Sequence, residues 1–531
     1  MTPLVDNASD RAAGRARPAE VALLASVFVV AACGLVYELA AGTLASYLLG
    51  DSILQFSTVI GSYLFAMGVG SYLSRFFERQ LVAHFLRIEL LVGFVGGLMP
   101  AALFALQTLA APSFRFALYA LVLLVGILVG LEIPLVMRIL KRQFRGAADG
   151  GSRGRYALKE LVSQVLTFDY LGALAVSIAF PLLLVPQLGL VRTGVLFGLM
   201  NAAVAVWALL LFRGELRRFA AHAMACGLVV ASLLAAFVAA DHITTWAEDR
   251  FYAEPVLYRE TSAYQRVVVT AGPHGVRLFL NGNLQFHSRD EYRYHEALVH
   301  PAMAGHGAPK NVLVLGGGDG MAVREVLKYA SVERVTLVEL DPHMTTLFST
   351  QPLLRQLNAD SLHSPKVRIV NEDAFAWLEA NPGSYDVIVV DFPDPTNFSI
   401  GKLYTASFYR LIDQHLNASG YAVVQTTSPL IARKSFWTVA TTLEAAGLTT
   451  TPYHAHVPSF GEWGFILASR RPYRVPQRPD ELPAGLRFLS VGDLPTLFNF
   501  PLDMARVPAE VNRLSNQVLV QTFEDEWGRV H

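Results

Sequence analysis

The sequence predicts a chain of two structural classes. An N-terminal α-helical, multi-span membrane domain precedes a C-terminal α/β domain of the Rossmann-like type, which opens with a small antiparallel β domain. Long apolar runs lie almost entirely before about residue 240. The charged, turn-rich remainder contains strands that alternate with helices, and one strand runs into a glycine-rich loop. With 531 residues, the chain is also too long for one ordinary domain.

Changes in composition divide the chain into five predicted parts. Residues 1–20 form a basic tail, and residues 21–245 form the membrane domain. Residues 250–300 form the small β domain, residues 301–470 form the Rossmann-like domain, and residues 471–531 form a C-terminal extension.

The membrane prediction starts from the apolar composition. The hydrophobic fraction of 53% and the mean hydropathy of +0.39 are high for a purely soluble protein. A membrane-spanning helix needs about 20 apolar residues. About seven segments meet this requirement, namely 21–45, 53–76, 85–109, 116–136, 161–186, 190–212 and 219–240. The first is too long for the core of a secretory signal, so we expect it to be retained as a span.

Basic residues are concentrated in alternate connections between these segments. One set of connections contains Arg11, Arg15, Arg17, Arg75, Arg79, Arg87, Arg138, Lys141, Arg142, Arg145, Arg153, Arg155, Lys159, Arg213, Arg217 and Arg218. The other set contains little beyond Arg115 and Arg192. The positive-inside rule therefore predicts that the N-terminus is cytoplasmic.

Four acidic residues fall within or at the edges of the apolar segments: Glu38, Glu89, Glu132 and Asp169. Charges at membrane depth are costly and usually face a cavity or a partner. They are compatible with a path for a cationic ligand. Interhelical hydrogen bonding is the simpler interpretation, and we favour it here.

The predicted α/β domain begins with short strands. Apolar and polar residues alternate within 255–286, and many of the side chains are β-branched, which indicates a small antiparallel sheet. The apolar strand that starts at Asn311 then runs into the glycine loop 316–320, and a helix follows. The next strand ends near Glu339, about 20 residues beyond the loop, where a carboxylate can accept both hydroxyls of a ribose.

Acidic residues follow several of the predicted parallel strands. Ligands of open parallel sheets bind beyond the carboxyl ends of the strands. We therefore expect five carboxylates to converge on one crevice: Asp319, Glu339, Asp373, Asp391 and Asp394. Any one of them could instead be an ordinary cap or turn residue.

Such an acidic crevice suits a cationic ligand. It also discriminates between two related nucleosides. S-adenosylmethionine carries a carboxylate that Asp319 in the glycine loop would repel. The decarboxylated form presents only an ammonium group there, which Asp319 would attract.

The sequence gives no indication of nucleic acid binding or of a metal site. The formal net charge is zero, and no long basic run is present. The two cysteines, Cys33 and Cys226, both lie in apolar stretches, so neither a disulfide framework nor a zinc-ligand spacing is possible.

At these positions the sequence closely resembles the spermidine synthase family, including its long membrane-bound members. The resemblance covers about residues 255–470. The matching stretches are Tyr264-Gln265, 316–320, 324–327, 338–341, 385–391, Asp394-Pro395, Leu403-Tyr404, Phe408-Tyr409 and 461–465, with 500–504 in the extension. The resemblance implies a methyltransferase-type fold and aminopropyl transfer from decarboxylated S-adenosylmethionine to putrescine or a related diamine, giving spermidine and 5'-methylthioadenosine without a metal.

The resemblance also implies roles for individual residues. Asp391 would be the catalytic base. The residues implied to bind the nucleoside co-substrate are Gln265, Asp319, Glu339, Asp373 and Ala374. Those implied to bind the amine or to line its path are Tyr294, His295, Asp319, Asp391, Asp394 and Phe460.

Two departures from the family pattern affect the predicted amine site. Phe392 and Pro393 stand where soluble members usually have two small residues, and Asn397-Phe398 replaces a common Gly-Pro. The preferred acceptor is therefore left open, as is the formation of a homo-oligomer. Two alternatives also stay open: a methyltransferase that uses intact S-adenosylmethionine, and a polyamine transporter with a non-catalytic nucleotide-binding domain.

The side of the membrane is a separate prediction. We expect a multi-pass protein of the cell (inner) membrane. Seven spans and a cytoplasmic N-terminus would place the α/β domain outside, yet adenosyl compounds are made in the cytoplasm. We therefore expect a cytoplasmic catalytic domain and an even number of crossings. Segment 161–186, which contains Asp169 and Gly172 and ends in two prolines, is the best candidate for an incomplete crossing.

Overall fold

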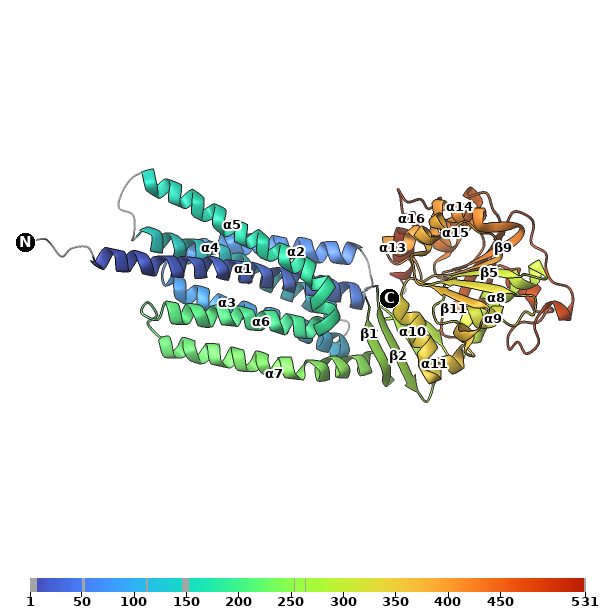
Figure 1. Ribbon diagram of the computed structural model, residues 1–531, viewed down its shortest axis with the longest axis horizontal. Helices are drawn as coiled ribbons and strands as arrows, with labels where there is room; N and C mark the ends of the chain where they lie inside the picture. Colours follow the sequence, from blue (N-terminus) through green and yellow to red (C-terminus); the bar gives the residue numbers. More distant parts are fainter. Residues whose placement is uncertain are drawn as a thin grey trace, which may run out of the picture. The chain divides into compact units, whose positions relative to one another are not determined.

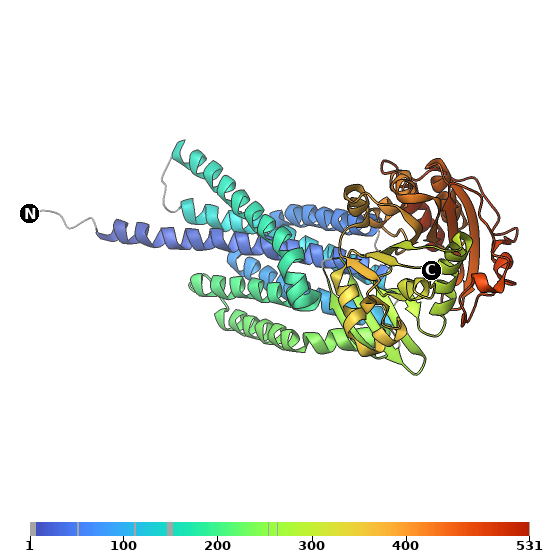
Figure 2. The same ribbon diagram turned by 45° about the vertical axis from the view of Figure 1, so that its right-hand side comes forward.

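The computed structural model describes residues 7–49, 53–110, 113–145, 152–252, 254–262 and 264–529. The chain divides into two compact units, Met1–Glu254 and Pro255–His531. Figures 1 and 2 show that the first unit is helical and that the second contains the sheets. The predicted fold class is thereby confirmed. Of the predicted basic tail, residues 1–6 lie outside the described residues.

Long helices lying side by side form the first unit (Figures 1 and 2). They are α1 (Asn7–Leu49), α2 (Ile53–Leu73), α3 (Leu81–Ala110), α4 (Phe114–Arg145), α5 (Ser152–Ala179), α6 (Val185–Leu211) and α7 (Phe219–Phe251). Close packing depends on glycine at some contacts. A Cβ atom on Gly130 of α4 would lie 2.2 Å from the carbonyl oxygen of Met67 in α2. Small residues of this kind let helix backbones approach each other in a membrane.

Among the described residues of this unit, six segments are long and apolar enough to cross a membrane. The fifth, Val162–Leu211, has 50 residues and contains two of the predicted apolar segments. A helix of that length would extend roughly 75 Å, whereas the hydrocarbon core of a bilayer is about 30 Å thick. The helix is broken at Gly189, where φ is +73° and ψ is 168°, after the π-helical turn η3 (Phe180–Leu184). The chain reverses direction in this region (Figures 1 and 2).

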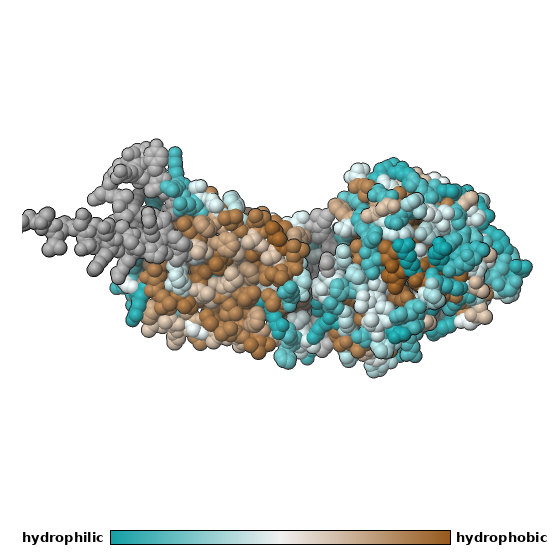
Figure 3. Space-filling view, viewed as in Figure 1, coloured by the Kyte–Doolittle hydropathy of each residue, from teal (hydrophilic) through white to brown (hydrophobic). Residues whose placement is uncertain are grey.

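The outward-facing side chains of the helical unit are also apolar. Figure 3 shows an almost continuous hydrophobic surface over the helices. Phe65, Leu182, Leu210 and Val238 are between 63% and 78% exposed. An exposed apolar surface of this extent is typical of helices that face lipid. Together with the six candidate spans, it indicates a membrane protein.

The second unit opens with a four-stranded antiparallel sheet in the order β1-β2-β3-β4. The strands are β1 (Val256–Thr261), β2 (Arg266–Gly272), β3 (Gly275–Leu280) and β4 (Asn283–His287). The alternating pattern of these residues places one face against the core, where Val267, Val269 and Leu278 are buried. Helix α8 (Glu291–His306) follows and packs against the larger sheet.

The larger sheet has seven strands in the order β10-β11-β9-β8-β5-β6-β7. They are β5 (Asn311–Gly316), β6 (Arg334–Val338), β7 (Val367–Val370), β8 (Tyr385–Asp391), β9 (Leu416–Thr426), β10 (Thr449–Val457) and β11 (Gly461–Ser469). Strands β7, β6, β5, β8 and β9 are parallel to one another. Strand β11 is antiparallel to β9, and β10 is antiparallel to β11. The strand order reverses at β5, which lies between β6 and β8, and ligands of such sheets bind at this reversal.

Both faces of the larger sheet are buried. Val312 and Val314 of β5 belong to one hydrophobic core, and Leu313 and Leu315 of the same strand belong to another. Helices that cover the sheet include α9 (Met321–Val326), α10 (Pro342–Thr350), α12 (Ala374–Ala380), α14 (Ala406–His415) and α15 (Arg433–Ala445). The C-terminal extension packs back on this domain through α16 (Val518–Trp527), whose Trp527 donates to Thr427 Oγ1 at 2.9 Å.

Candidate active site

The glycine loop brings β5 and β8 into close contact at their carboxyl ends. Gly316 is the last residue of β5 and pairs in register with Asp391, the last residue of β8. A Cβ atom on Gly316 would lie 2.2 Å from the carbonyl oxygen of Asp391, and its φ is +77°. Only glycine fits this position, so the loop fixes the place of Asp391.

Glu339, which follows β6, lies against the same loop. Its carboxylate accepts hydrogen bonds from the backbone N–H groups of Gly318, at 3.1 Å, and Asp341, at 2.9 Å. Burial raises the pKa of Glu339 to about 7, although these two N–H groups oppose the shift. The carboxylate is therefore held at the loop, and its role in binding a ribose stays a prediction.

Asp391 is oriented by a tyrosine of α8. The hydroxyl group of Tyr294 donates to Asp391 Oδ1 at 2.6 Å. Burial raises the pKa of Asp391 to about 6; His295 and Tyr294 lower it, and Asp319 raises it. A carboxyl group with a pKa just below neutrality is suited to accept a proton at physiological pH.

Asp394, three residues further along, has a buried oxygen without a partner. No donor in the described part of the chain reaches its Oδ1 atom. Burial raises the pKa of Asp394 to about 7, and Gln425 partly offsets this effect. Tyr294 and Tyr404 both interact electrostatically with Asp391 and Asp394, which shows that the two carboxyl groups face the same region.

Asp319 completes this group of carboxylates. Its Oδ1 atom accepts from the backbone N–H of Met321 at 2.9 Å, at the start of α9. Burial raises its pKa, and the charge of His295 lowers it. Since Asp319 also interacts with Glu339 and Asp391, four of the five predicted carboxylates converge.

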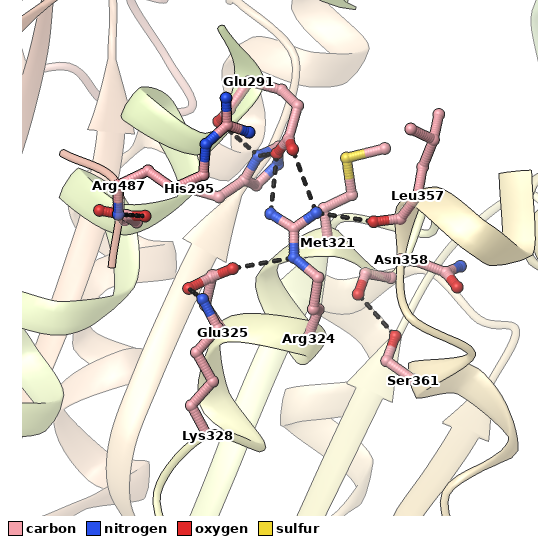
Figure 4. A network of polar contacts seen from close by, with 12 residues as sticks. Glu291, His295, Met321, Arg324, Glu325, Lys328, Leu357, Asn358, Ser361 and Arg487 are labelled. Carbon is pink, nitrogen blue, oxygen red and sulfur yellow. Dashed lines mark hydrogen bonds and ion pairs between the residues drawn. The ribbon is translucent and has the colours of Figure 1, made fainter. Parts of the chain in front are cut away.

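Figure 4 shows a network of charged side chains that includes His295. The Nδ1–H group of His295 donates to Glu291 Oε2 at 2.8 Å, and Arg324 donates to the same oxygen at 2.9 Å. Glu325 accepts from Arg324 and, at 2.5 Å, from Lys328. Burial lowers the pKa of His295, but Glu291 outweighs it and raises the pKa to about 9. His295 is therefore an imidazolium that interacts electrostatically with the acids of the site.

The remaining predicted residues are engaged differently. Gln265 donates to Asp341 Oδ2 at 3.1 Å, beside the glycine loop. Asp373 caps α12 and forms a 2.6 Å ion pair with Lys402, so its carboxylate is already neutralised. Ala374 is the first residue of α12 and is buried.

Phe460 contributes to an aromatic wall beside the acids. Its ring lies 6.3 Å from that of Tyr294 and 5.2 Å from that of Trp463. The indole N–H of Trp463 donates to Gln425 Oε1 at 3.1 Å. Gln425 in turn donates to the backbone carbonyl of Phe392 and to Tyr404, so this wall is connected to the segment that carries Asp391 and Asp394.

Gln425 and Glu291 were not among the residues predicted for the site. Gln425 is a polar residue inside the apolar strand β9, which is the one local signal that could have identified it. Glu291 gives no such signal, because an acidic residue in the first turn of a helix is ordinary. Within the described ranges, no group of three or more His, Cys, Asp or Glu side chains could hold a metal ion.

Known proteins are similar to this chain over most of its length. Residues 291–477 match the spermine/spermidine synthase domain. The chain is 54% identical to polyamine aminopropyltransferase 2 of Ralstonia nicotianae, over 95% of this chain and 98% of that protein. It is 48% identical to the polyamine aminopropyltransferase of Leptospira interrogans, over 96% of this chain and 99% of that protein.

A solved structure was also found. A spermidine synthase in complex with the transition-state analogue AdoDATO shares 28% identity, with a TM-score of 0.44, and the match covers 46% of this chain and 85% of that one. The two full-length relatives confirm the resemblance, the enzyme class and its place in polyamine biosynthesis. The chain therefore belongs to the polyamine aminopropyltransferase family, and its activity is that of an aminopropyltransferase.

Proposed function

We propose that this aminopropyltransferase uses putrescine as its acceptor and produces spermidine and 5'-methylthioadenosine. The observation that carries the proposal is the pair of carboxyl groups at the end of β8. Asp391 is held by Tyr294, and Asp394 has a buried oxygen that lacks a hydrogen-bond donor. An ammonium group supplies both a donor and a positive charge, so a diamine suits this pair.

The two carboxyl groups have different roles in this proposal. Asp394 binds the distal ammonium of the diamine and thereby fixes its orientation. Asp391 accepts a proton from the amine that reacts, because its pKa of about 6 leaves it ionised at neutral pH. Phe460 borders the carbon chain of the diamine through its contact with Tyr294.

The co-substrate implied by the family is decarboxylated S-adenosylmethionine. Asp319 suits its aminopropyl ammonium, since an acidic residue would repel the carboxylate of the parent compound. Glu339 suits the ribose hydroxyls, and Gln265 borders the same loop through Asp341. Asp373 and Ala374 at the start of α12 border the adenine in this proposal.

The reaction is one displacement at carbon. The free amine nitrogen forms a bond to the aminopropyl methylene next to the sulfonium, and the carbon–sulfur bond breaks. Its electron pair stays on sulfur, so methylthioadenosine leaves as a neutral thioether, and the proton of the new ammonium passes to Asp391. Because the sulfonium is a good leaving group, the protein contributes chiefly proximity, orientation and the base.

Release of methylthioadenosine by the purified full-length chain tests the proposal. We expect release from decarboxylated S-adenosylmethionine that depends on putrescine and exceeds that with 1,3-diaminopropane, cadaverine or spermidine, with spermidine as the product. A higher kcat/KM for another amine would replace putrescine as the acceptor. Methyl transfer from intact S-adenosylmethionine in place of aminopropyl transfer would contradict the roles of Asp319, Asp391 and Asp394.

A further inference from the structure

A second group of polar side chains lies inside the apolar helical unit. Glu89 of α3, Glu132 of α4, Asn201 of α6 and Tyr37 of α1 have no exposed surface. They come from four different helices and lie among hydrophobic side chains. Charged and polar groups in such surroundings are costly unless they are paired, so their presence needs a physical reason.

These four side chains form one cluster. The amide Nδ2 of Asn201 donates to Glu89 Oε2 at 3.2 Å. The carboxyl groups of Glu89 and Glu132 interact electrostatically, and the hydroxyl group of Tyr37 interacts with both. The ring of Tyr37 packs directly against Gly96 of α3, where a Cβ atom would lie only 2.8 Å from the ring.

The cluster contains more acceptors than donors. Five buried oxygen atoms of the cluster have no hydrogen-bond partner among the described residues: Glu89 Oε1, both carboxyl oxygens of Glu132, Asn201 Oδ1 and the hydroxyl oxygen of Tyr37. No cationic side chain in the part of the chain that the structure describes acts on either carboxyl group. Nearby Arg138 is directed elsewhere, since it donates to the carbonyl oxygens of Ser74 and Phe77.

The cluster lies well inside the span. Glu89 is roughly 12 Å along α3 from Leu81, and Glu132 is roughly 15 Å along α4 from Arg142, at 1.5 Å per residue. Both distances start from the same end of the bundle, because Arg138 of α4 contacts the connection between α2 and α3. A bilayer core is about 30 Å thick, so the two carboxyl groups lie near its middle.

The missing donors indicate the chemical class of a ligand. One proton shared by two carboxyl groups would supply a single donor, and no hydrogen bond joins Glu89 to Glu132. A primary ammonium supplies three N–H donors and a positive charge. We propose that Glu89, Glu132, Asn201 and Tyr37 form a binding site for the primary ammonium of an alkylamine within the membrane domain. The choice of an amine rests in part on the proposed function, whereas the geometry of the cluster does not.

Amine binding to the full-length chain in nanodiscs tests this site. The Asp391→Asn, Asp394→Asn double variant serves as the background, so that the second unit contributes little amine binding. We expect this background to bind radiolabelled putrescine and n-butylamine to displace it, because one ammonium is sufficient, whereas n-butanol does not. Adding Glu132→Gln should weaken binding about 30-fold or more, the loss typical of one member of a buried charge pair.

Matched variants control for folding and for position. Glu215→Gln alters an exposed acid of the same unit and should leave binding unchanged. Tyr37→Phe removes one hydroxyl group and should weaken putrescine binding about fivefold. If Glu132→Gln does not fold, the putrescine affinity of Tyr37→Phe tests the site in its place. Glu215→Gln with an intact second unit should also release methylthioadenosine at the wild-type rate.

Infrared difference spectra separate an amine site from a proton site. Putrescine should change the carboxyl bands of the background protein but not those of its Glu132→Gln derivative. Carboxyl bands that respond to pH but not to putrescine would overturn the proposal in favour of proton binding. Equal putrescine binding with and without Glu132→Gln would also overturn it. Absence of methylthioadenosine release with every amine would instead refute the proposed function and leave the binding result intact.

Discussion

Asp391→Asn is the most direct test of the proposed base. Asparagine has the same shape, so Gly316 can keep its contact with the backbone of residue 391. The hydroxyl group of Tyr294 can still donate to the side-chain oxygen that replaces Asp391 Oδ1. The substitution therefore removes the charge and the ability to accept a proton, and it leaves the local packing in place.

Two effects of opposite sign follow from the environment of Asp391. Loss of a general base should lower kcat about 100- to 10,000-fold, or about 2.7 to 5.5 kcal/mol. Burial raises the pKa of Asp391 from 3.8 to about 6, so its ionised form destabilises the fold. At 1.36 kcal/mol per pH unit, this difference corresponds to about 3 kcal/mol. The penalty is fully present above pH 6 and disappears as pH falls below 3.8.

The assay is methylthioadenosine release between pH 5 and pH 9, with thermal unfolding measured at pH 8 and pH 4. We expect the wild-type rate to fall about tenfold per pH unit below pH 6. The variant should be nearly inactive and should unfold at a higher temperature than wild type at pH 8 but not at pH 4. Binding of methylthioadenosine should be retained. Asp360→Asn, at an exposed ion pair with Arg355, is the matched control. A near-normal rate for Asp391→Asn at neutral pH would refute the assignment.

Three further predictions concern the co-substrate, the protons of the site and the membrane. Asp319→Ala should weaken binding of decarboxylated S-adenosylmethionine more than that of methylthioadenosine, which lacks the ammonium; equal losses, measured by calorimetry, would make Asp319 a loop-forming residue only. Since burial raises the pKa of both Asp394 and Glu339 to about 7, amine binding should release protons at pH 6.5 and release fewer at pH 8. Binding enthalpies independent of the buffer at pH 6.5 would contradict this. Reporter fusions after residues 240 and 531 should both report a cytoplasmic location, and activity of a periplasmic reporter at both points would place the catalytic domain outside.

Local patterns were sufficient to predict part of the site. The glycine loop starts at the end of β5, Glu339 follows β6 directly and Asp391 ends β8, and parallel strands bring their carboxyl ends to one edge. Asp373 lies three residues beyond the end of β7, yet it caps a helix and pairs with Lys402. Whether a strand-end acid faces the crevice or a neighbouring cation depends on tertiary packing, which sequence position alone does not reveal.

The partners of the predicted residues were beyond sequence reasoning for the same reason. Gln425 lies 31 residues after Asp394 and reaches it because β9 lies next to β8 in the sheet. Glu291 lies 33 residues before Arg324, and their pairing requires α8 to pack against α9. In the helical unit, an apolar window cannot detect the break at Gly189, so the extent of segment 161–186 could not be predicted from the sequence.

In the proposed function, the charge balance of the second unit explains how one site accepts two cationic molecules. His295 acts electrostatically on Asp319 and Asp391, Arg324 also acts on Asp319, and both cations are already paired with Glu291. Among the described residues, the four carboxyl groups of Asp319, Glu339, Asp391 and Asp394 therefore outnumber the cations that act on them. Decarboxylated S-adenosylmethionine brings a sulfonium and an ammonium, and a diamine brings up to two ammonium groups. Each substrate ionises the acids that face it, and this strengthens attraction for the second substrate. After the reaction the methylthioadenosine product is neutral. It therefore lacks the electrostatic attraction to the acids that held the co-substrate.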